Sequence, residues 1–248
     1  MKKYTILFLI VCSLLSFSQI ALSKPLMICI VQLERWGEVD PSTQKLVGIY
    51  PDLFREFLKR TQTKANFQLA PYSRVMRTLE SGRCDLSATI PADSIKNSVQ
   101  LGEEIWTIKH GLYTKPEQKF TEYGQLKGLN IGVLRGAAIT PKFDSDTSFN
   151  KVTSTHYSNL LSMLARDRIQ GVVADVDIIN TILNSPNGQH LRFADPLILN
   201  EQSITVIMSN SSGYLAEFDR FNAALSSITD DGTLKQIVYH HLSTSPFK

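Results

Sequence analysis

LMICIV, residues 26–31, opens the stretch that decides the fold of this chain. It is a short, continuous apolar run, typical of a strand in a parallel sheet that is covered on both faces. Helical patterns follow over 51–60 (PDLFREFLKR) and 72–81 (YSRVMRTLES), and strand patterns over 66–69 (NFQL) and 85–90 (DLSATI). This strand–helix–strand–helix–strand order predicts an α/β unit with a parallel sheet and right-handed crossovers.

The pattern restarts after residues 115–119 (KPEQK), a polar, turn-like segment that indicates a boundary. The elements expected next are strands over 129–134 and 171–174 and helices from about 139, over 157–168 and over 175–183. Two more helices are expected over 215–228 and 233–242, separated by Asp230-Asp231-Gly232. We therefore predict two α/β lobes.

Composition and charge narrow the class of protein. The chain has 248 residues, 43% hydrophobic and 20% charged, which is typical of a globular protein. Its formal net charge is +3, but Lys2 and Lys3 lie in a segment without acidic residues. The remainder of the chain, from residue 24 onward, contains 24 of the 26 basic residues and all 23 acidic residues, so its charges nearly balance. A near-neutral protein lacks the basic surface that nucleic acid requires, so we expect no such partner.

Residues 1–23 have the pattern of a signal peptide. Lys2 and Lys3 precede an apolar run over 4–17, and Ala21-Leu22-Ser23 supplies the small residues of a cleavage site. The run is shorter than the roughly 20 residues of a membrane span, which disfavours the alternative of an anchor. Cys12 suggests lipid attachment as a minor alternative. We expect export, with cleavage near Ser23.

The two cysteines beyond this segment, Cys29 and Cys84, have two interpretations. In an oxidising compartment an even pair is a potential disulfide. Two buried thiols on neighbouring strands fit the sequence equally well, because free cysteine is among the most buried residue types. The sequence leaves both open.

Sequence motifs of catalysis are missing. The chain has no G-x-S-x-G, P-loop, G-x-G-x-x-G or H-E-x-x-H motif, and its five histidines show no metal-ligand spacing. We therefore predict no catalytic residues, no metal site and no cofactor.

Five motifs in order carry a resemblance to a known family. They are LVGIYPDL (46–53), LESGRCD (79–85), LNIGVLRG (129–136), LARDR leading to VVAD (164–175), and FNAAL followed by DGTL (221–234). The chain resembles the bacterial extracellular solute-binding proteins of family 3, which are periplasmic binders of polar amino acids and related solutes. Each motif is weak alone, and their shared order makes the resemblance specific.

The resemblance implies an α/β, two-lobed type II periplasmic binding protein fold. Each lobe would be a mostly parallel sheet flanked by helices, with two crossing hinge strands near 110–114 and 203–208. Beyond the signal peptide, the segments expected are 24–112 for the first part of lobe 1, 113–205 for lobe 2 and 206–248 for the C-terminal helices of lobe 1.

The implied function is capture of a small polar solute in the cleft between the lobes, with hinge closure. We expect a periplasmic monomer that delivers its ligand to an ABC-type permease and is not an enzyme. Two alternatives stay open: an enzyme on the same fold, of the cyclohexadienyl dehydratase type, and a ligand-sensing module for a membrane partner.

Ten residues are expected to line the cleft: Glu34, Trp36, Tyr72, Arg74, Thr89, Lys96, Arg135, Gly136, Ala137 and Asp175. Trp36 lies in a polar loop that we expect to be exposed, where the family places an aromatic residue over the ligand. A core position is the alternative for Trp36. Asp175 matches the family carboxylate that pairs with a ligand ammonium group, and it also suits the N-cap of the helix after it.

Two departures from the family weaken the expectation of an α-amino acid. The family arginine that binds the ligand carboxylate is absent. Lys96 lies near the corresponding position, but its ammonium group is a point charge and not a bidentate guanidinium. The family Ser or Thr after the second-lobe glycine is replaced by Ala137-Ala138, although backbone N–H groups there, beside Arg135, suit an anion. Arg74 is expected either to replace the missing guanidinium or to form a structural salt bridge.

Overall fold

The computed structural model of the chain describes residues 24–186 and 188–243. The predicted signal peptide and Cys12 lie outside this part. Within it, no helix is long and apolar enough to cross a membrane.

The first lobe is built around three parallel strands. Its strands are β1 (Leu26–Val31), β4 (Ala65–Ala70) and β5 (Leu86–Thr89), and its helices α2 (Ile49–Thr61) and α3 (Tyr72–Glu80) connect them. β1 pairs in parallel with both β4 and β5, as the alternating pattern predicts. α2 buries Leu53, Phe54 and Phe57, the apolar stripe seen in the sequence. Two short strands, β2 (Glu38–Val39) and β3 (Leu46–Val47), form a hairpin beside this lobe.

The second lobe repeats this plan. Its strands are β7 (Asn130–Leu134), β8 (Asn150–Ser154) and β9 (Gly171–Asp175), and its helices are α4 (Pro141–Ser145), α5 (Tyr157–Ala165) and α6 (Val176–Asn184). β7 pairs in parallel with β8 and β9. β8 was not predicted, because its sequence NKVTS has no apolar run and it lies at the edge of the sheet. The expected helix from about residue 139 is the single short helix α4, which begins at Pro141.

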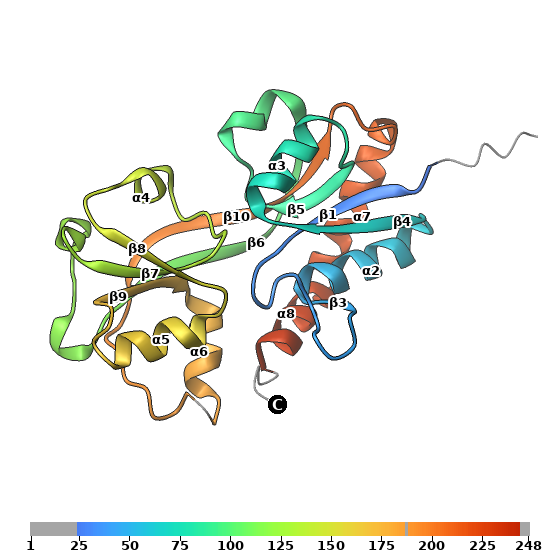
Figure 1. Cartoon of the computed structure of the whole chain (residues 1–248). Coiled ribbons are helices and arrows are strands. Elements are labelled where there is room, and N and C mark those ends of the chain that lie inside the picture. Colours follow the sequence, from blue (N-terminus) through green and yellow to red (C-terminus); the bar gives the residue numbers. More distant parts are fainter. Residues whose placement is uncertain (1–23, 187, 244–248) are drawn as a thin grey trace, which may run out of the picture.

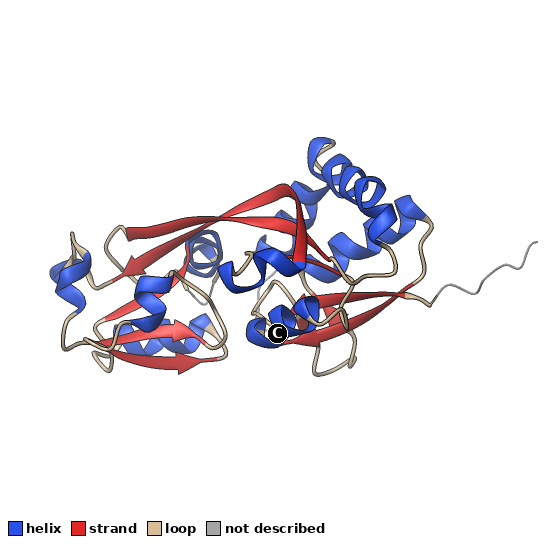
Figure 2. Cartoon of the chain, turned by 90° about the horizontal axis from the view of Figure 1, so that it is seen from above, coloured by secondary structure: helices blue, strands red, loops and turns tan. Residues whose placement is uncertain are grey.

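Two long antiparallel strands join the lobes, β6 (Val99–Tyr113) and β10 (Leu197–Ser209). Figures 1 and 2 show them running from one group of elements to the other. They complete one sheet with the strand order β4-β1-β5-β10-β6-β9-β7-β8. Both are longer than the crossing strands expected near 110–114 and 203–208, and Thr114 lies just beyond β6. The sequence did not indicate the full length of β6, because polar residues on its exposed face interrupt the apolar pattern.

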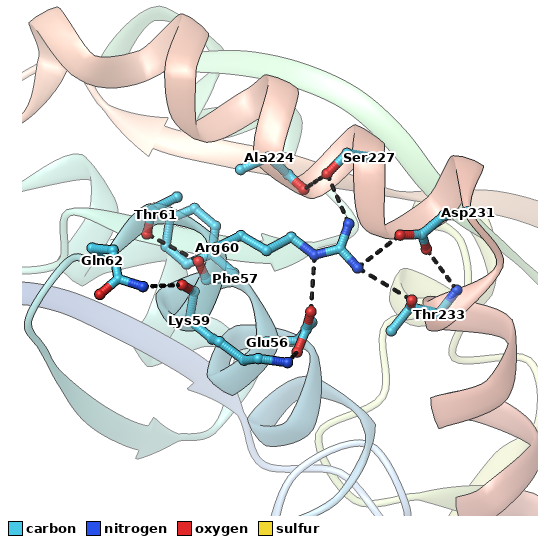
Figure 3. Close-up of polar contacts among 10 residues, drawn as sticks. All are labelled: Glu56, Phe57, Lys59, Arg60, Thr61, Gln62, Ala224, Ser227, Asp231 and Thr233. Atoms are coloured by element: carbon cyan, nitrogen blue, oxygen red, sulfur yellow. Dashed lines mark hydrogen bonds and ion pairs between the residues drawn. The ribbon is translucent and has the colours of Figure 1, made fainter.

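The C-terminal helices return to the first lobe, as the resemblance implies. After the short 3₁₀ turn η4 (Leu215–Glu217), α7 (Phe218–Asp230) and α8 (Thr233–Ser243) pack against α2. The rings of Phe57 and Phe221 meet edge to face with centroids 5.2 Å apart. Arg60 of α2 binds Glu56 on its own helix and Ser227, Asp231 and Thr233 at the junction of α7 and α8 (Figure 3). One guanidinium thus ties the C-terminal segment to the first lobe.

Cys29 and Cys84 form a disulfide, with their Cα atoms 5.9 Å apart. Cys29 lies in β1, and Cys84 lies in the turn that leads from α3 into β5. The sequence left open a disulfide or two buried thiols, and the structure has the disulfide.

Candidate functional site

A small cavity lies between the two lobes, and we call it the inner pocket. Its volume is about 30 Å³. It is lined by Val31, Leu33, Tyr50, Tyr72, Thr89, Ile90, Ile108, His110, Gly136, Ala137, Ala138, Tyr157 and Asp175. These residues come from β1, α2, α3, β5 and β6 on one side and from α5, β9 and the loop after β7 on the other.

A larger depression of about 460 Å³ adjoins the inner pocket, and we call it the outer hollow. It is lined by Gln32, Leu33, Glu34, Glu38, Val39, Pro71, Leu134, Arg135, Gly136, Thr155 and His156. Leu33 and Gly136 line both spaces, so the two are neighbours. Together they form a cleft that narrows toward the hinge strands.

Asp175 is the buried carboxylate of the inner pocket. It ends β9 and caps α6, because one of its oxygens accepts the backbone N–H groups of Asp177 (2.9 Å) and Ile178 (3.4 Å). The other oxygen accepts the indole N–H of Trp36 at 3.3 Å. Burial raises its pKa to about 7 with a contribution from the charge of Asp177, and these hydrogen bonds oppose the rise. A cation beside this carboxylate would favour its ionised form.

His110 pairs with Asp175 in the register of β6 and β9 and lines the same pocket. It is 5% exposed, and its Nδ1 has no hydrogen-bond partner among the described residues. Burial lowers the pKa of His110 to about 4, so its imidazole is neutral at physiological pH. His110 was not among the residues predicted from the sequence. The one indication in the sequence was that a histidine occurs in a segment expected to form a crossing strand.

The loop between β1 and β2 is buried between the lobes, which corrects the expectation that it is exposed. Glu34, Arg35 and Trp36 are each 7% exposed or less. Trp36 packs beside Tyr50 with ring centroids 5.1 Å apart and does not line the inner pocket, yet its bond to Asp175 crosses between the lobes. The loop is buried by both lobes: Glu34 and Trp36 bind Tyr157 and Asp175 of the second lobe, and Arg35 donates to the carbonyl of His241 in α8.

Glu34 makes a second connection across the cleft. Its carboxylate accepts the backbone N–H of Tyr157 at 2.7 Å, at the start of α5, and lies 3.4 Å from Nδ1 of His156. Burial raises the pKa of Glu34, while the Tyr157 hydrogen bond and His156 act against this. With Trp36 and Asp175 also joined, the structure is that of closed lobes.

Four other predicted residues lie together at the inner pocket: Tyr72, Thr89, Gly136 and Ala137. The Tyr72 hydroxyl donates to the carbonyl of Ile90 at 3.0 Å, which holds the ring in place. Gly136 has a φ of 83°, a left-handed conformation that favours glycine, and no atom lies within 4 Å of where its Cβ would be. A bound molecule thus has room to approach its backbone.

The three predicted cations lie away from the inner pocket. Lys96 pairs with Asp93 at 2.7 Å on the exposed 3₁₀ helix η1 (Asp93–Ser98). Arg74 is exposed on α3 and lines neither space, and Arg135 is an exposed residue of the outer hollow. The inner pocket therefore combines one carboxylate with neutral side chains. In the part of the chain that the structure describes, no cluster of His, Cys, Asp and Glu has the arrangement of a metal site.

Two lobes joined by two long crossing strands and closed over a pocket that holds a buried carboxylate define a ligand-binding module of the hinged class. The family model of the bacterial extracellular solute-binding proteins, family 3, matches residues 36–244. The chain belongs to this family, as its motifs indicated, and is therefore a solute-binding protein.

Solved structures with this fold cover most of the chain at low identity. The ligand-binding core of GluR0 in complex with L-glutamate has a TM-score of 0.71 at 10% identity and covers 90% of this chain and 100% of its own. The amino acid ABC transporter substrate-binding protein AbpA from Streptococcus pneumoniae, bound to L-arginine, has a TM-score of 0.67 at 16% identity, covering 88% of this chain and 94% of its own.

A histidine kinase sensor domain with similarity to periplasmic binding proteins is a third similar structure. Its TM-score is 0.70 at 15% identity, and the match covers 88% of this chain and 96% of that domain. Among curated protein sequences, none matches this chain significantly.

Proposed function

We propose that this chain captures a small solute with an amino group, an amino acid or a related compound, in the inner pocket and delivers it to an ABC-type permease. The observation that carries this proposal is Asp175, a buried carboxylate at the contact between the lobes. A ligand cation there would compensate the cost of burying its charge. Similar structures bound to L-arginine and L-glutamate support the ligand class.

The proposal includes a cycle of opening and closing. Among the described residues, 24–112 and 206–243 would form one lobe and 113–186 with 188–205 the other, and the lobes would rotate about β6 and β10. The predicted end of the first lobe, 244–248, lies outside the described residues. Glu34 and Trp36 bind across the cleft on closing. We further propose that residues 1–23 are removed as a signal peptide and that the mature protein works in the periplasm as a monomer.

Thermal-shift screening of the purified protein against amino acids, amines and small organic acids tests the ligand class. A ligand that binds the folded state alone raises the melting temperature. We expect an amine-bearing compound to give the largest shift, and Asp175→Asn to weaken its binding by about 2–5 kcal/mol if the charge pair is buried. Equal binding by the variant would contradict the role of Asp175. Stabilisation by dicarboxylates or sugars alone would contradict the ligand class.

The sensor-domain neighbour supports a second candidate function, in which the liganded protein docks on a membrane receptor. Uptake of labelled ligand by cells with and without this protein separates the two: loss of uptake on deletion supports transport, and unchanged uptake supports sensing. We propose no catalysis for either role. Turnover of prephenate or arogenate by the purified protein would contradict this.

A further inference from the structure

The turn between β1 and β2 sends three consecutive side chains to different elements. Glu34 accepts a backbone N–H at the start of α5, and the indole of Trp36 donates to Asp175 at the end of β9, so both reach the second lobe. Arg35, which lies between them, binds its own lobe instead: its Nη1 donates to the carbonyl of His241 in α8 at 2.6 Å. This turn therefore connects the contacts of the closed cleft with the C-terminal helix.

The backbone of this turn has an unusual conformation. Arg35 has a φ of 67°, in the left-handed region that a residue with a Cβ rarely adopts. Such a backbone costs energy and persists where the surrounding structure holds it. The carbonyls of Arg35 and Trp36 accept the backbone N–H groups of Ile49 (3.0 Å) and Tyr50 (2.8 Å) at the start of α2. The bond from Arg35 to α8 adds a side-chain anchor to these backbone bonds.

The carbonyl that Arg35 binds lies in the last turn of α8, where carbonyls lack partners within the helix. A cation at this position also interacts favourably with the helix dipole. The side chain of His241 binds Asp52 in the first turn of α2, with Nε2 and Oδ2 2.7 Å apart. α8 also contacts α6 of the second lobe. The helix that anchors Arg35 is therefore fixed to the first lobe and touches the second.

The anchor is formed by a buried cation. Arg35 is 7% exposed, and burial lowers its pKa, while the charges of Glu34 and Glu38 act against this. Arginine stays protonated in proteins, so its guanidinium needs hydrogen-bond partners wherever it is buried. Hydrogen bonds from a charged donor are stronger than those between neutral groups, which makes this contact a firm one.

We propose that Arg35 is a positioning residue for lobe closure, and that its bond to the end of α8 holds Glu34 and Trp36 where they meet the second lobe. The bonds of the Arg35 side chain and of the turn with α2 lie within the first lobe. The turn is therefore ordered before the lobes close, and less conformational freedom is lost on closing. This inference rests on the proposed function and adds that α8 controls how readily the cleft closes.

Arg35→Asn tests the proposal in the unliganded protein. Asparagine tolerates a positive φ better than most residues and is too short to reach α8, so it removes the anchor and spares the turn. The equilibrium between closed and open lobes should shift about ten-fold toward open, the size expected for the loss of one hydrogen bond from a charged group. Small-angle X-ray scattering should show a larger radius of gyration. In a Trp106→Phe background, where Trp36 is the sole tryptophan, acrylamide should quench its fluorescence more strongly.

Three further variants complete the comparison. Arg35→Lys keeps a cationic donor and should give values between those of Arg35→Asn and the wild type. Two controls should match the wild type: Arg77→Gln, at an exposed position of α3, and Thr107→Ala, at an exposed position of the hinge strand β6. Unchanged scattering and quenching in Arg35→Asn would overturn the proposal. A lower melting temperature without either change would also overturn it, because that result indicates a structural role alone.

Ligand binding separates this inference from the proposed function. The compound with the largest thermal shift on the wild type should bind Arg35→Asn about ten-fold more weakly, because the variant closes less readily. Equal affinity for the two proteins would overturn the role of Arg35 and leave the proposed function intact. If no amino acid, amine or organic acid binds the wild type, the proposed function fails, whereas scattering and quenching still decide the role of Arg35.

Discussion

Folding raises the pKa of Asp175 and lowers the pKa of His110, although the two residues line one pocket. The pKa of Asp175 rises from 3.8 to about 7, so between these values the folded protein holds a proton that the unfolded chain has lost. This contribution to stability is full below the lower value and is lost as pH rises toward the upper one. The pKa of His110 falls from 6.5 to about 4, so there the unfolded chain holds the extra proton and stability rises with pH. The two effects oppose each other.

Single substitutions should therefore reveal slopes of opposite sign. For Asp175→Asn, the difference in unfolding free energy, wild type minus variant, should fall as pH rises from about 4 to about 7, with a limiting slope of ~1.4 kcal/mol per pH unit. For His110→Gln, the same difference should rise between about 4 and 6.5. Urea unfolding across this range measures both. Flat differences, such as we expect for Thr107→Ala, would contradict the assigned pKa shifts.

At the scale of elements, the Cys29–Cys84 disulfide joins the central strand of the first lobe to the entry of β5 across 55 residues. Because it closes a long loop in the unfolded chain, replacing both cysteines with alanine should lower the unfolding free energy by about 4 kcal/mol. Denaturant unfolding of the double variant measures the loss. Wild-type protein with a reductant should lose a similar amount, and equal stability with and without the reductant would contradict a structural disulfide.

At the scale of the whole molecule, hydrogen bonds from Glu34 and Trp36 connect the two lobes in the closed state, beside the contact of α6 with α8. Glu34→Ala removes the acceptor of the Tyr157 backbone N–H and leaves that buried donor unpaired, so the unliganded protein should shift toward open lobes. Small-angle X-ray scattering should then show a larger radius of gyration, which saturating ligand reverses. Glu117→Gln, at an exposed position of the second lobe, is the control. An unchanged radius for Glu34→Ala would show that Glu34 does not control closure.

Local pattern alone predicted most of the architecture. Continuous apolar runs marked β1, β7 and β9, helical stripes marked α2 and α5, and the order of motifs identified the family. These features can be read from the sequence because the buried face of a helix or strand requires apolar residues at the spacing of that element. Asp175 was selected through the resemblance to the family and not through local pattern.

Tertiary structure alone decided what depends on contacts between distant segments. Contacts from both lobes bury the Glu34–Trp36 loop, β6 and β9 bring His110 beside Asp175, and β1 meets the turn that carries Cys84. The tertiary structure also leaves Lys96 and Arg74 on the surface. The sequence had predicted that these two residues line the pocket and bind a ligand carboxylate. Sequence spacing carries no signal for such pairs, because their proximity and shared burial arise only when the lobes fold and close.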